Sequence, residues 1–434
     1  MISSPGALKD LFKHERRGAF AVIENQQMHT MAGHHAEPDR CKRIYELLHQ
    51  RAFRTLYRAF SPREILLRGP HINAIILRQI YIAVDNVDVG GNLSMTFFTR
   101  HVVFQTITTF FFGPHFPDIF DDGNLLDTHM ATIMYGLEVI VPSAIRARER
   151  LYNTFAAHLA LKWEEKGDGY LYGSADFISE IVRNMKSDDF SREEIPRYMI
   201  PILWGATSNL MSICTWVMGH LLGDSRVYKS VEHEIRLATD QLTSDDILSR
   251  DFKNMVPNLN SVIEEVLRTK TQVPLMRVAQ RDVILMDENR EIYIRKGDFV
   301  APDAPSLSLS SEQFDHPHSF KADRFISSTA GGALYVFGAG QHACAGKHLA
   351  MHIIRMVVIL SIHSFDIDLS AASDKVLKAN PISFSPWLKT ANDLVINLSP
   401  RSTTCAGKNL YEDDITSLSV KPQIYRIPTK PILL

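Results

Sequence analysis

The first 270 residues carry a mainly helical pattern of apolar and polar positions. Apolar residues recur every three or four positions, which is typical of amphipathic helices. Ser191 and Glu194 have the spacing of a capping box, so they predict the start of a long apolar helix that reaches about Leu222. Pro201 lies inside that helix and is expected to bend it. The other helices predicted in this part cover residues 43–60, 71–84, 93–112, 125–145, 175–185 and 256–268.

The pattern changes after residue 280. Short apolar runs separated by DENR and KGD predict strands at 283–285, 292–294 and 299–301. Leu349, Ile353, Met356, Val357 and Leu360 mark the inner face of another helix. The pattern of residues 364–399 predicts short strands and turns. The polar residues 401–434 are expected to form a loosely ordered tail. The chain is therefore predicted to be mainly α with a small β region.

Composition narrows the functional classes. The 434 residues are 45% hydrophobic, which is enough to build a sizeable core. A formal net charge of −2 gives no basic surface of the kind that binds nucleic acid. The apolar run 199–222 is interrupted by polar residues, so it indicates a buried core helix rather than a membrane span. The N-terminal segment resembles neither a signal peptide nor an anchor.

The cysteines and a group of histidines are possible metal ligands. Four cysteines, with no short-spaced pair, argue against a disulfide framework or a zinc site and fit a reducing compartment. His29, His34 and His35 lie in a stretch that reads as a loop, and no partner set is visible in the sequence. We therefore interpret them as surface histidines.

The string FGAGQHACAG, residues 337–346, holds the strongest candidate for chemistry. Glycines 338, 340 and 346 frame Cys344 and would let the backbone approach a flat cofactor. An apolar helix pattern begins just after the cysteine, and a helix start favours a thiolate over a thiol. The near-repeat CAGKNL at 405–410 lacks this frame, so we predict no role for Cys405. The alternative for Cys344 is a buried structural cysteine.

The spacing F-x-x-G-x-x-x-C-x-G resembles the haem-binding loop of the cytochrome P-450 superfamily. The resemblance implies a helical haem-thiolate fold over residues 1–400 and a haem b group whose iron takes the Cys344 thiolate as its axial ligand. It also implies that Phe337 packs near the sulfur, that Gly338, Gly340 and Gly346 shape the loop, and that His342 reaches a haem propionate.

Charged residues elsewhere strengthen the resemblance. Glu265 and Arg268 share a helix face and alone could be a solvated pair. With Arg324 of FKADRF, they resemble the family's buried Glu–Arg–Arg cluster, whose role is structural. By the same resemblance, Arg277 would bind a haem propionate. The alternative is an ordinary arginine in a strand.

The centre of the long helix, LWGATSNLMSICTW, departs from the family pattern. The family usually has an acid and a threonine that relay protons during dioxygen activation. Ser208 and Asn209 stand at those positions as the candidate catalytic pair, and Gly205 or Ala206 would leave room for dioxygen. The alternative is that both polar groups are satisfied locally. The pattern resembles the branch that contains sterol hydroxylases and prostacyclin synthase. By that resemblance, substrate contacts would include Val273, Pro274, Leu275 and Phe384.

The resemblance implies three functions that the sequence leaves open. The first is a monomeric monooxygenase that oxidises a sterol-, terpenoid- or polyketide-like substrate of specialised metabolism, with electrons from an NADPH-dependent reductase. The second is an isomerase or dehydratase that acts on a peroxide without a reductase. The third is a truncated, inactive haem protein, because the family's anchor and first strands would precede residue 1. Family members are associated with the endoplasmic reticulum membrane, whereas no anchor is visible in this chain.

Overall fold

Helices make up most of the protein. The computed structural model describes residues 2, 4–15, 17–22, 24–34, 37–85, 92–163, 175–272, 277–288, 290–301, 303–326, 335–340, 343–371, 373–380 and 388–401. The α-helices are α1 (Pro5–Glu15), α2 (Glu24–Ala32), α3 (Pro38–Leu47), α4 (Phe53–Ala59), α5 (Pro62–Asp85), α6 (Met95–Phe112), α7 (Phe120–Met134), α8 (Pro142–Trp163), α9 (Asp176–Ser187), α10 (Glu194–Gly223), α11 (Ser225–Thr239), α12 (Ser244–Ser249), α13 (Pro257–Lys270), α14 (Ala304–Ser308) and α15 (Lys347–Ser364). A π-helix η1 (Leu48–Ala52) joins α3 to α4, and two 3-10 turns are η2 (Glu138–Ile140) and η3 (Tyr335–Phe337).

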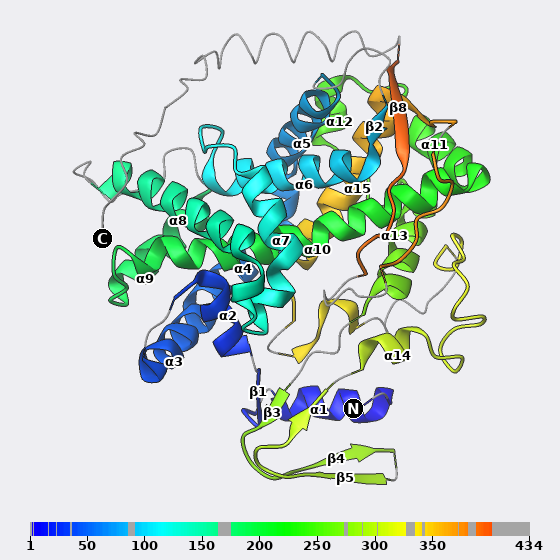
Figure 1. Ribbon diagram of the computed structural model, residues 1–434. Helices are drawn as coiled ribbons and strands as arrows, with labels where there is room; N and C mark the ends of the chain where they lie inside the picture. The colour runs from blue at the N-terminus through cyan, green and yellow to red at the C-terminus, as the bar shows by residue number, and fades with distance from the viewer. Residues whose placement is uncertain are drawn as a thin grey trace.

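The strands form small antiparallel sheets at the edges of the helical body. One sheet has the order β1 (Phe20–Val22), β3 (Arg277–Ala279), β6 (Phe299–Val300), and a hairpin pairs β4 (Val283–Asp287) with β5 (Arg290–Ile294). A third sheet has the order β2 (Leu93–Ser94), β8 (Val395–Pro400), β7 (Phe365–Leu369). Figure 1 shows α1 with β1, β3, β4 and β5 as a lobe below the helices. This lobe has its own small core, built on Leu8, Leu11, Phe20 and Leu285.

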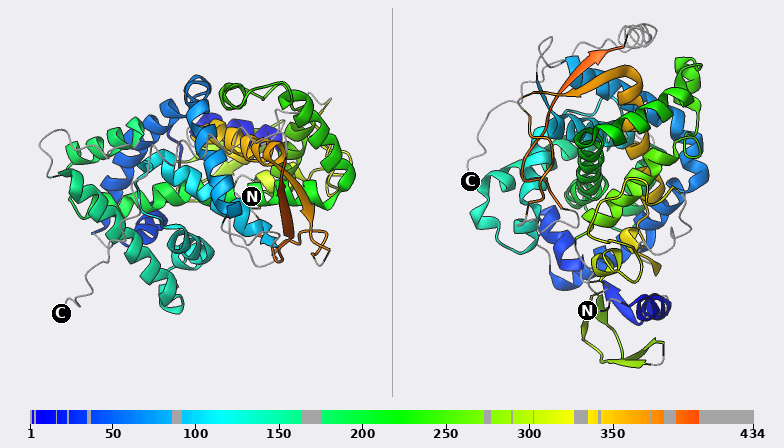
Figure 2. Two further views of the ribbon diagram at one scale, coloured as in Figure 1. Left: turned by 90° about the horizontal axis from the view of Figure 1, so that it is seen from above. Right: turned by 90° about the vertical axis from the view of Figure 1, so that its right-hand side faces the viewer.

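Helix α10 is the central element of the fold. It crosses the middle of the molecule in Figure 1 and is seen nearly end-on in the right-hand view of Figure 2. It packs on α6, α8, α13 and α15, and most of its side chains are buried in the main core. An apolar helix surrounded by other helices needs no polar face, which explains its near-continuous hydrophobic sequence.

The fold class predicted from the sequence is confirmed, and the start of α10 is confirmed in detail. The Ser191 N–H donates to Glu194 Oε2 at 2.8 Å, and the Glu194 N–H donates to Ser191 Oγ at 3.0 Å. The single helix predicted over 125–145 is wrong. Gly136 adopts φ +75° after α7, and Pro142 starts α8, so the chain turns between two helices.

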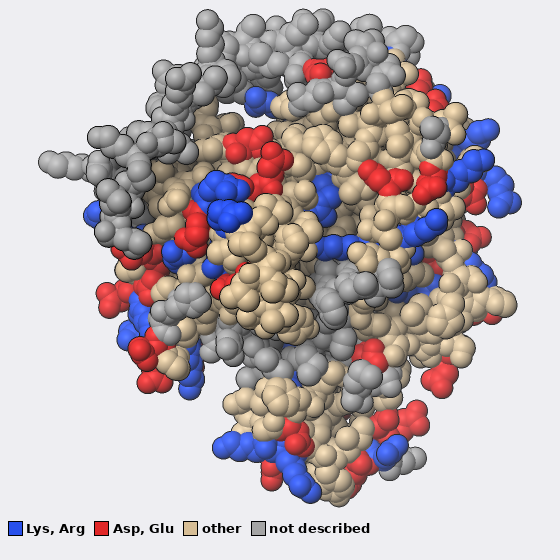
Figure 3. Space-filling view, in the orientation of Figure 1, with Lys and Arg blue, Asp and Glu red and all other residues tan. Residues whose placement is uncertain are grey.

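The described surface fits the small net charge. On the face drawn in Figure 3, Lys and Arg are interspersed with Asp and Glu, and neither sign forms a continuous field.

Among the described residues, no helix combines the length and apolarity needed to cross a membrane. The predicted tail over 401–434 lies outside the described residues, apart from Arg401.

Candidate functional site

The cysteine loop closes on itself before α15 begins. After the turn η3, Gly338 and Gly340 take φ values of +68° and +71°, which favour glycine because a Cβ is disfavoured there. The Cys344 N–H donates to the Phe337 carbonyl at 2.7 Å, which joins the two ends of the loop. The Lys347 ammonium lies 5.7 Å from the centre of the Phe337 ring. The backbone hydrogen bond thus holds Phe337 next to Cys344 in the loop.

Cys344 lies at the N-terminal end of α15, whose N-cap is Gly346. Its side chain remains accessible at the surface of the described residues. Partial loss of hydration raises the pKa of the Cys344 thiol, while the N–H groups of Gly346 and Lys347 and the charge of Lys347 act to lower it. The thiol therefore has backbone donors in place for a negative sulfur, and a bound cation would stabilise the thiolate further.

A buried ion pair supports the loop from the N-terminal lobe. Arg277 on β3 donates from Nε to Glu15 Oε1 at 2.5 Å, and both side chains are buried. A Cβ placed on Gly340 would lie 2.4 Å from Glu15 Oε2, so the glycine is needed for this close approach. Burial raises the pKa of Glu15 more than Arg277 lowers it. Arg277 is thus next to the cysteine loop, and Glu15 is a contact that local sequence patterns did not indicate.

One face of α10, around Gly205, is left uncovered by the described residues. Gly205 is exposed although it lies at the centre of a core helix, and a Cβ built there meets no atom of the described residues within 4 Å. Ala206 and Asn209 on the same face are only partly buried. Asn209 Oδ1 is buried without a hydrogen-bond partner in the described part of the chain. Because unsatisfied buried polar atoms are rare, this carbonyl marks a place where a further group fits.

Ser208 does not share that open face. It is buried, and its hydroxyl donates to Asp127 on α7. Asp127 also accepts from Trp204 Nε1 at 3.0 Å, from Arg100 at 2.7 Å and from Lys389 at 3.1 Å. Burial raises the pKa of Asp127, but Lys389 and Arg100 outweigh it and lower the pKa to about 2. The two residues named as the candidate catalytic pair therefore point in different directions, since adjacent helix residues are about 100° apart.

The three residues of the predicted Glu–Arg–Arg cluster do come together. Arg268 donates from Nε and NH2 to the two carboxylate oxygens of Glu265, each at 2.7 Å, and both side chains have no exposed area. Arg324 Nε adds contacts of 3.1 and 3.0 Å to the same carboxylate. The spare donors of Arg268 bind the carbonyls of Ser308 and Pro317 at 2.7 Å. The cluster therefore fastens the segment after α14, which precedes the cysteine loop, to α13.

Several predicted site residues lie outside the described residues. These are His342, Val273, Pro274, Leu275 and Phe384. Their proposed contacts with haem or substrate stay predictions.

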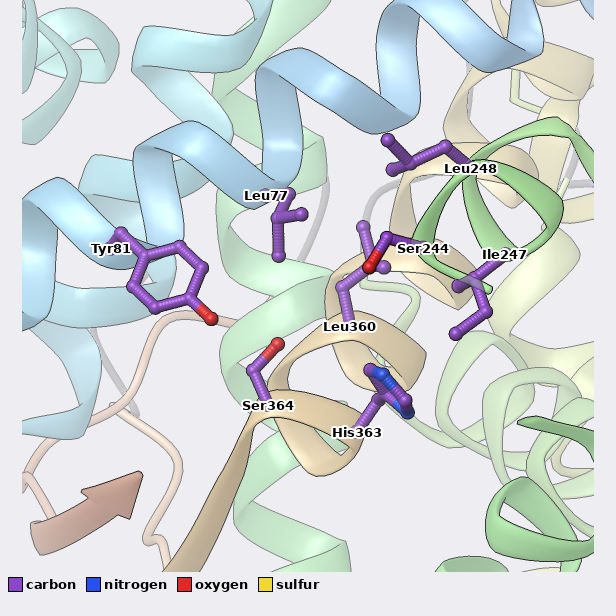
Figure 4. A pocket seen from close by; sticks show the side chains of 8 residues that line it. All are labelled: Leu77, Tyr81, Ser244, Ile247, Leu248, Leu360, His363 and Ser364. Atoms are coloured by element: carbon purple, nitrogen blue, oxygen red, sulfur yellow. The ribbon is translucent and has the colours of Figure 1, made fainter. Parts of the chain in front are cut away.

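A small pocket elsewhere is separate from the cysteine loop. Its lining side chains come from α5, α12 and the second half of α15, and they include Tyr81, Ile247 and His363 (Figure 4). Leu360 lies thirteen residues after Lys347 on α15, which corresponds to about 20 Å along the helix. The mostly apolar lining and this separation indicate a packing gap rather than a part of the Cys344 site.

Comparison with known proteins identifies the family. The cytochrome P-450 family model matches residues 57–387, which is most of the chain. The chain therefore belongs to the cytochrome P-450 family, whose members hold haem through a cysteine thiolate. A retinoic-acid-bound cyanobacterial CYP120A1 structure superposes with a TM-score of 0.67 at 18% identity, covering 92% of this chain and 88% of that one. That likeness shows the fold.

Several of the curated relatives are sterol hydroxylases by name, and all of those reported below match at low identity. A 25-hydroxycholesterol 7-alpha-hydroxylase of Rattus norvegicus is 28% identical over 193 residues, which cover 40% of this chain and 47% of the relative. A 7-alpha-hydroxycholest-4-en-3-one 12-alpha-hydroxylase of Oryctolagus cuniculus is 25% identical over 260 residues, covering 55% of this chain and 51% of the relative. The chain spans about half the length of the curated relatives it matches.

The residues present fit a haem group. The accessible Cys344 thiol has backbone donors suited to a thiolate, and the glycine face of α10 leaves space that no described side chain fills. The buried Asn209 carbonyl needs a partner, and the Arg277 guanidinium lies beside the loop. A large, flat group with an iron ion and anionic edges would meet each of these requirements.

Proposed function

We propose that this protein is a haem-thiolate monooxygenase that oxidises a hydrophobic small molecule. The observation that carries the proposal is the Cys344 loop. It presents one accessible thiol at a helix N-terminus, with backbone N–H groups directed to the sulfur, in a chain of the cytochrome P-450 family. When bound, a thiolate-ligated haem would supply dioxygen activation, because the thiolate donates electron density that favours O–O cleavage.

We assign the other site residues by their surroundings. Cys344 would ligate the iron, and Gly338, Gly340 and Gly346 would keep the loop close to the cofactor. Arg277, which lies beside the loop, would neutralise one propionate, and His342 would serve the other. Asn209 would offer its amide to water or substrate on the open face of α10, with its neighbour Ser208 fixed by Asp127.

The proposed substrate is sterol-like or similarly apolar. The named reactions of the relatives act on sterols, and the low identity supports only the broader class of hydrophobic substrates. The open face of α10 offers a glycine, an alanine and a single amide, which suits an apolar ligand with few polar groups. Val273, Pro274, Leu275 and Phe384 remain the proposed further contacts, and a role in specialised metabolism remains part of the proposal.

The electron source separates the main proposal from a second one. A monooxygenase needs electrons, which an NADPH-dependent reductase would deliver. A peroxide isomerase or dehydratase needs none, and Asn209 keeps this candidate open because an amide does not supply the ionisable proton of an acid. Product formation that requires both NADPH and reductase supports the monooxygenase, whereas turnover of a peroxide without them supports the isomerase.

The thiolate assignment is tested by the ferrous carbon monoxide difference spectrum. The wild-type protein should show a strongly red-shifted Soret band, and Cys344→Ala should lose it. Cys405→Ser is the matched control, because its CAGK string repeats that of Cys344, and it should keep the band. If Cys344→Ala kept the shifted band, or if the wild-type protein took up no haem, the proposal would be overturned.

We also propose that the protein touches the endoplasmic reticulum membrane with the segment between α7 and α8. Tyr135, Leu137, Val139 and Ile140 are exposed there, within six residues. Exposed apolar side chains that lie this close together in the chain are costly in water and suit a lipid interface. Flotation with phosphatidylcholine vesicles should carry the wild-type protein and should fall clearly for Val139→Asp. Equal flotation of the two proteins would contradict this contact.

A further inference from the structure

Two histidines, a cysteine and a tyrosine meet between α2, α3 and α10. His29 is buried, so the interpretation of this residue as a surface histidine is wrong. His29 Nδ1 lies 2.6 Å from the hydroxyl oxygen of the buried Tyr198, and His34 Nδ1 lies 3.0 Å from the same oxygen. Ligand atoms of His29, His34 and Cys41 lie within 4.8 Å of one another. Of the residues that the structure describes, this is the group that combines three such ligands.

The end of α2 explains why the two histidines converge. Gly33 has φ +63°, the His34 N–H donates to the His29 carbonyl at 3.0 Å, and the Gly33 N–H donates to the Thr30 carbonyl at 3.1 Å. This is the Schellman motif, which reverses the chain at a helix C-terminus. It folds His34 back towards His29, and both rings then face Tyr198 on α10.

The third ligand is fixed by the start of α3. Pro38 opens this helix, which places Cys41 in its first turn. Arg40 donates to Glu194 on α10 from Nε at 3.1 Å and from NH2 at 2.7 Å. His29 Nε2 lies 2.8 Å from the Cys41 carbonyl, so α2 and α3 are joined at the cluster. Contacts among α2, α3 and α10 thus fix the position of Cys41 before any ion binds.

We propose that His29, His34 and Cys41 form a binding site for a zinc-like divalent cation. Imidazole nitrogen and thiolate sulfur are the ligands that such ions prefer, and three protein ligands leave one tetrahedral position. The Tyr198 hydroxyl, which contacts both histidines, is a candidate for that position. Ligand atoms around tetrahedral zinc are about 3.5 Å apart. Side-chain rotations that move each ligand atom by about an ångström would therefore bring all three within bonding distance of one ion.

The site has a structural role and is distinct from the Cys344 site. Tyr198 and Asn209 are eleven residues apart on α10, which corresponds to about 16 Å along the helix. A bound ion would tie α2 and α3 to the N-terminal half of the helix whose centre carries the open face. The inference does not depend on the reaction proposed above, since its test measures metal and thiol reactivity.

The test uses zinc as the probe on haem-loaded protein that has been freed of metal with a chelator. Calorimetric titration should give one zinc per chain, and elemental analysis after desalting should find it retained. Cys41→Ser and His34→Ala should each weaken binding by at least about ten-fold, because each removes one ligand. His115→Ala, an exposed histidine outside the cluster, is the matched control and should bind as the wild type does.

A second measurement follows the Cys41 thiol itself. Zinc should slow alkylation of Cys41 by iodoacetamide, read by peptide mass spectrometry, at least about ten-fold in the wild type and not in His34→Ala. The Soret band should stay unchanged throughout, because Cys344 is not a zinc ligand. The proposal is overturned if the wild type retains no zinc, if Cys41→Ser and His34→Ala bind it as well as the wild type, or if zinc leaves the alkylation rate of Cys41 unchanged. The first result would show a purely hydrogen-bonded cluster around Tyr198.

Discussion

Asp127 shows how one buried residue can organise several helices. Its carboxylate receives donors from α6, α10 and the segment before β8, and it is almost fully buried. A buried charge is costly unless it is paired and hydrogen-bonded, and here Lys389 and Arg100 supply the pairing. Ser208 and Trp204 bind the same group, so the orientation of the α10 centre depends on it.

Acid should lower the free energy of unfolding by protonating Asp127. Its folded-state pKa, about 2, lies below the ordinary value, so its contribution is complete above about pH 5 and is lost as the pH falls through about 4 to 2. We expect Asp127→Asn to lower the free energy of unfolding by about 3 kcal/mol at pH 7. Urea unfolding of both proteins at pH 7, 5 and 3 should show the difference shrinking towards acid. A difference that stays constant with pH would contradict this account.

Gly340 combines two requirements that can be separated by substitution. Its φ of +71° is unfavourable for other residues, and a Cβ would collide with the Glu15 carboxylate. Gly297 has φ +89°, but no atom in the described part of the chain lies within 4 Å of its Cβ position, so Gly297→Ala reports the backbone effect alone. We expect about 1 kcal/mol of destabilisation for Gly297→Ala and at least twice that for Gly340→Ala, with reduced haem content only in the latter. Equal effects of the two substitutions would show that the Glu15 contact is unimportant.

At the scale of elements, α10 contains two glycines with opposite surroundings. The Cβ of an alanine at 205 would enter open space, whereas at 219 it would lie 2.2 Å from Leu377. Gly205→Ala should therefore stabilise the protein by about 0.5–1 kcal/mol, and Gly219→Ala should destabilise it by about 1–3 kcal/mol through overpacking. Thermal unfolding of both variants in the haem-free state checks the signs. Destabilisation of the haem-free protein by Gly205→Ala would mean that a neighbouring side chain does fill that space.

The Glu265 cluster links α13 to the segment before the cysteine loop. Glu265→Gln would leave two arginines near a neutral amide, and we expect a loss of about 3–5 kcal/mol together with a loss of haem. Arg226→Ala removes an exposed ion pair with Asp224 and should change stability by less than about 0.5 kcal/mol. Chemical unfolding gives the stability of both variants, and haem absorbance gives their haem content. A small effect of Glu265→Gln would place the support of the loop elsewhere.

Elements with a strong apolar pattern could be predicted from the sequence, and weakly patterned ones could not. The long run of α10 and its capping box are local signals, and the structure matches them. Helix α11 buries only Val231, Ile235 and Thr239, so it lacks a long apolar run like that of α10, and it was missed. The break between α7 and α8 was missed because the apolar period continues across Gly136.

At the scale of the whole molecule, the candidate site combines local and distant contacts. The residues of the cysteine loop follow one another in the sequence, so the spacing of the motif alone is enough to indicate the loop. The Glu15–Arg277 pair spans 262 positions, and the contact of Tyr198 with His29 spans 169. Such pairs depend on how the N-terminal lobe and α2 dock on the helical body, which no periodicity in a single sequence encodes. Asp127 was missed for the same reason.

The amide of Asn209 has a consequence for how the rate of turnover should respond to acidity. A carboxylate at this position would protonate as the solution is acidified, and activity would then fall along an acidic limb. Asn209 carries no charge to lose. The carboxylate of Asp127, which accepts a hydrogen bond from the neighbouring Ser208, stays ionised until about pH 2. We therefore expect a kcat profile that is level from about pH 5.5 to 8, with an acidic limb introduced by Asn209→Asp. A steep acidic limb in the wild-type protein would mean that proton delivery comes from a group other than these two.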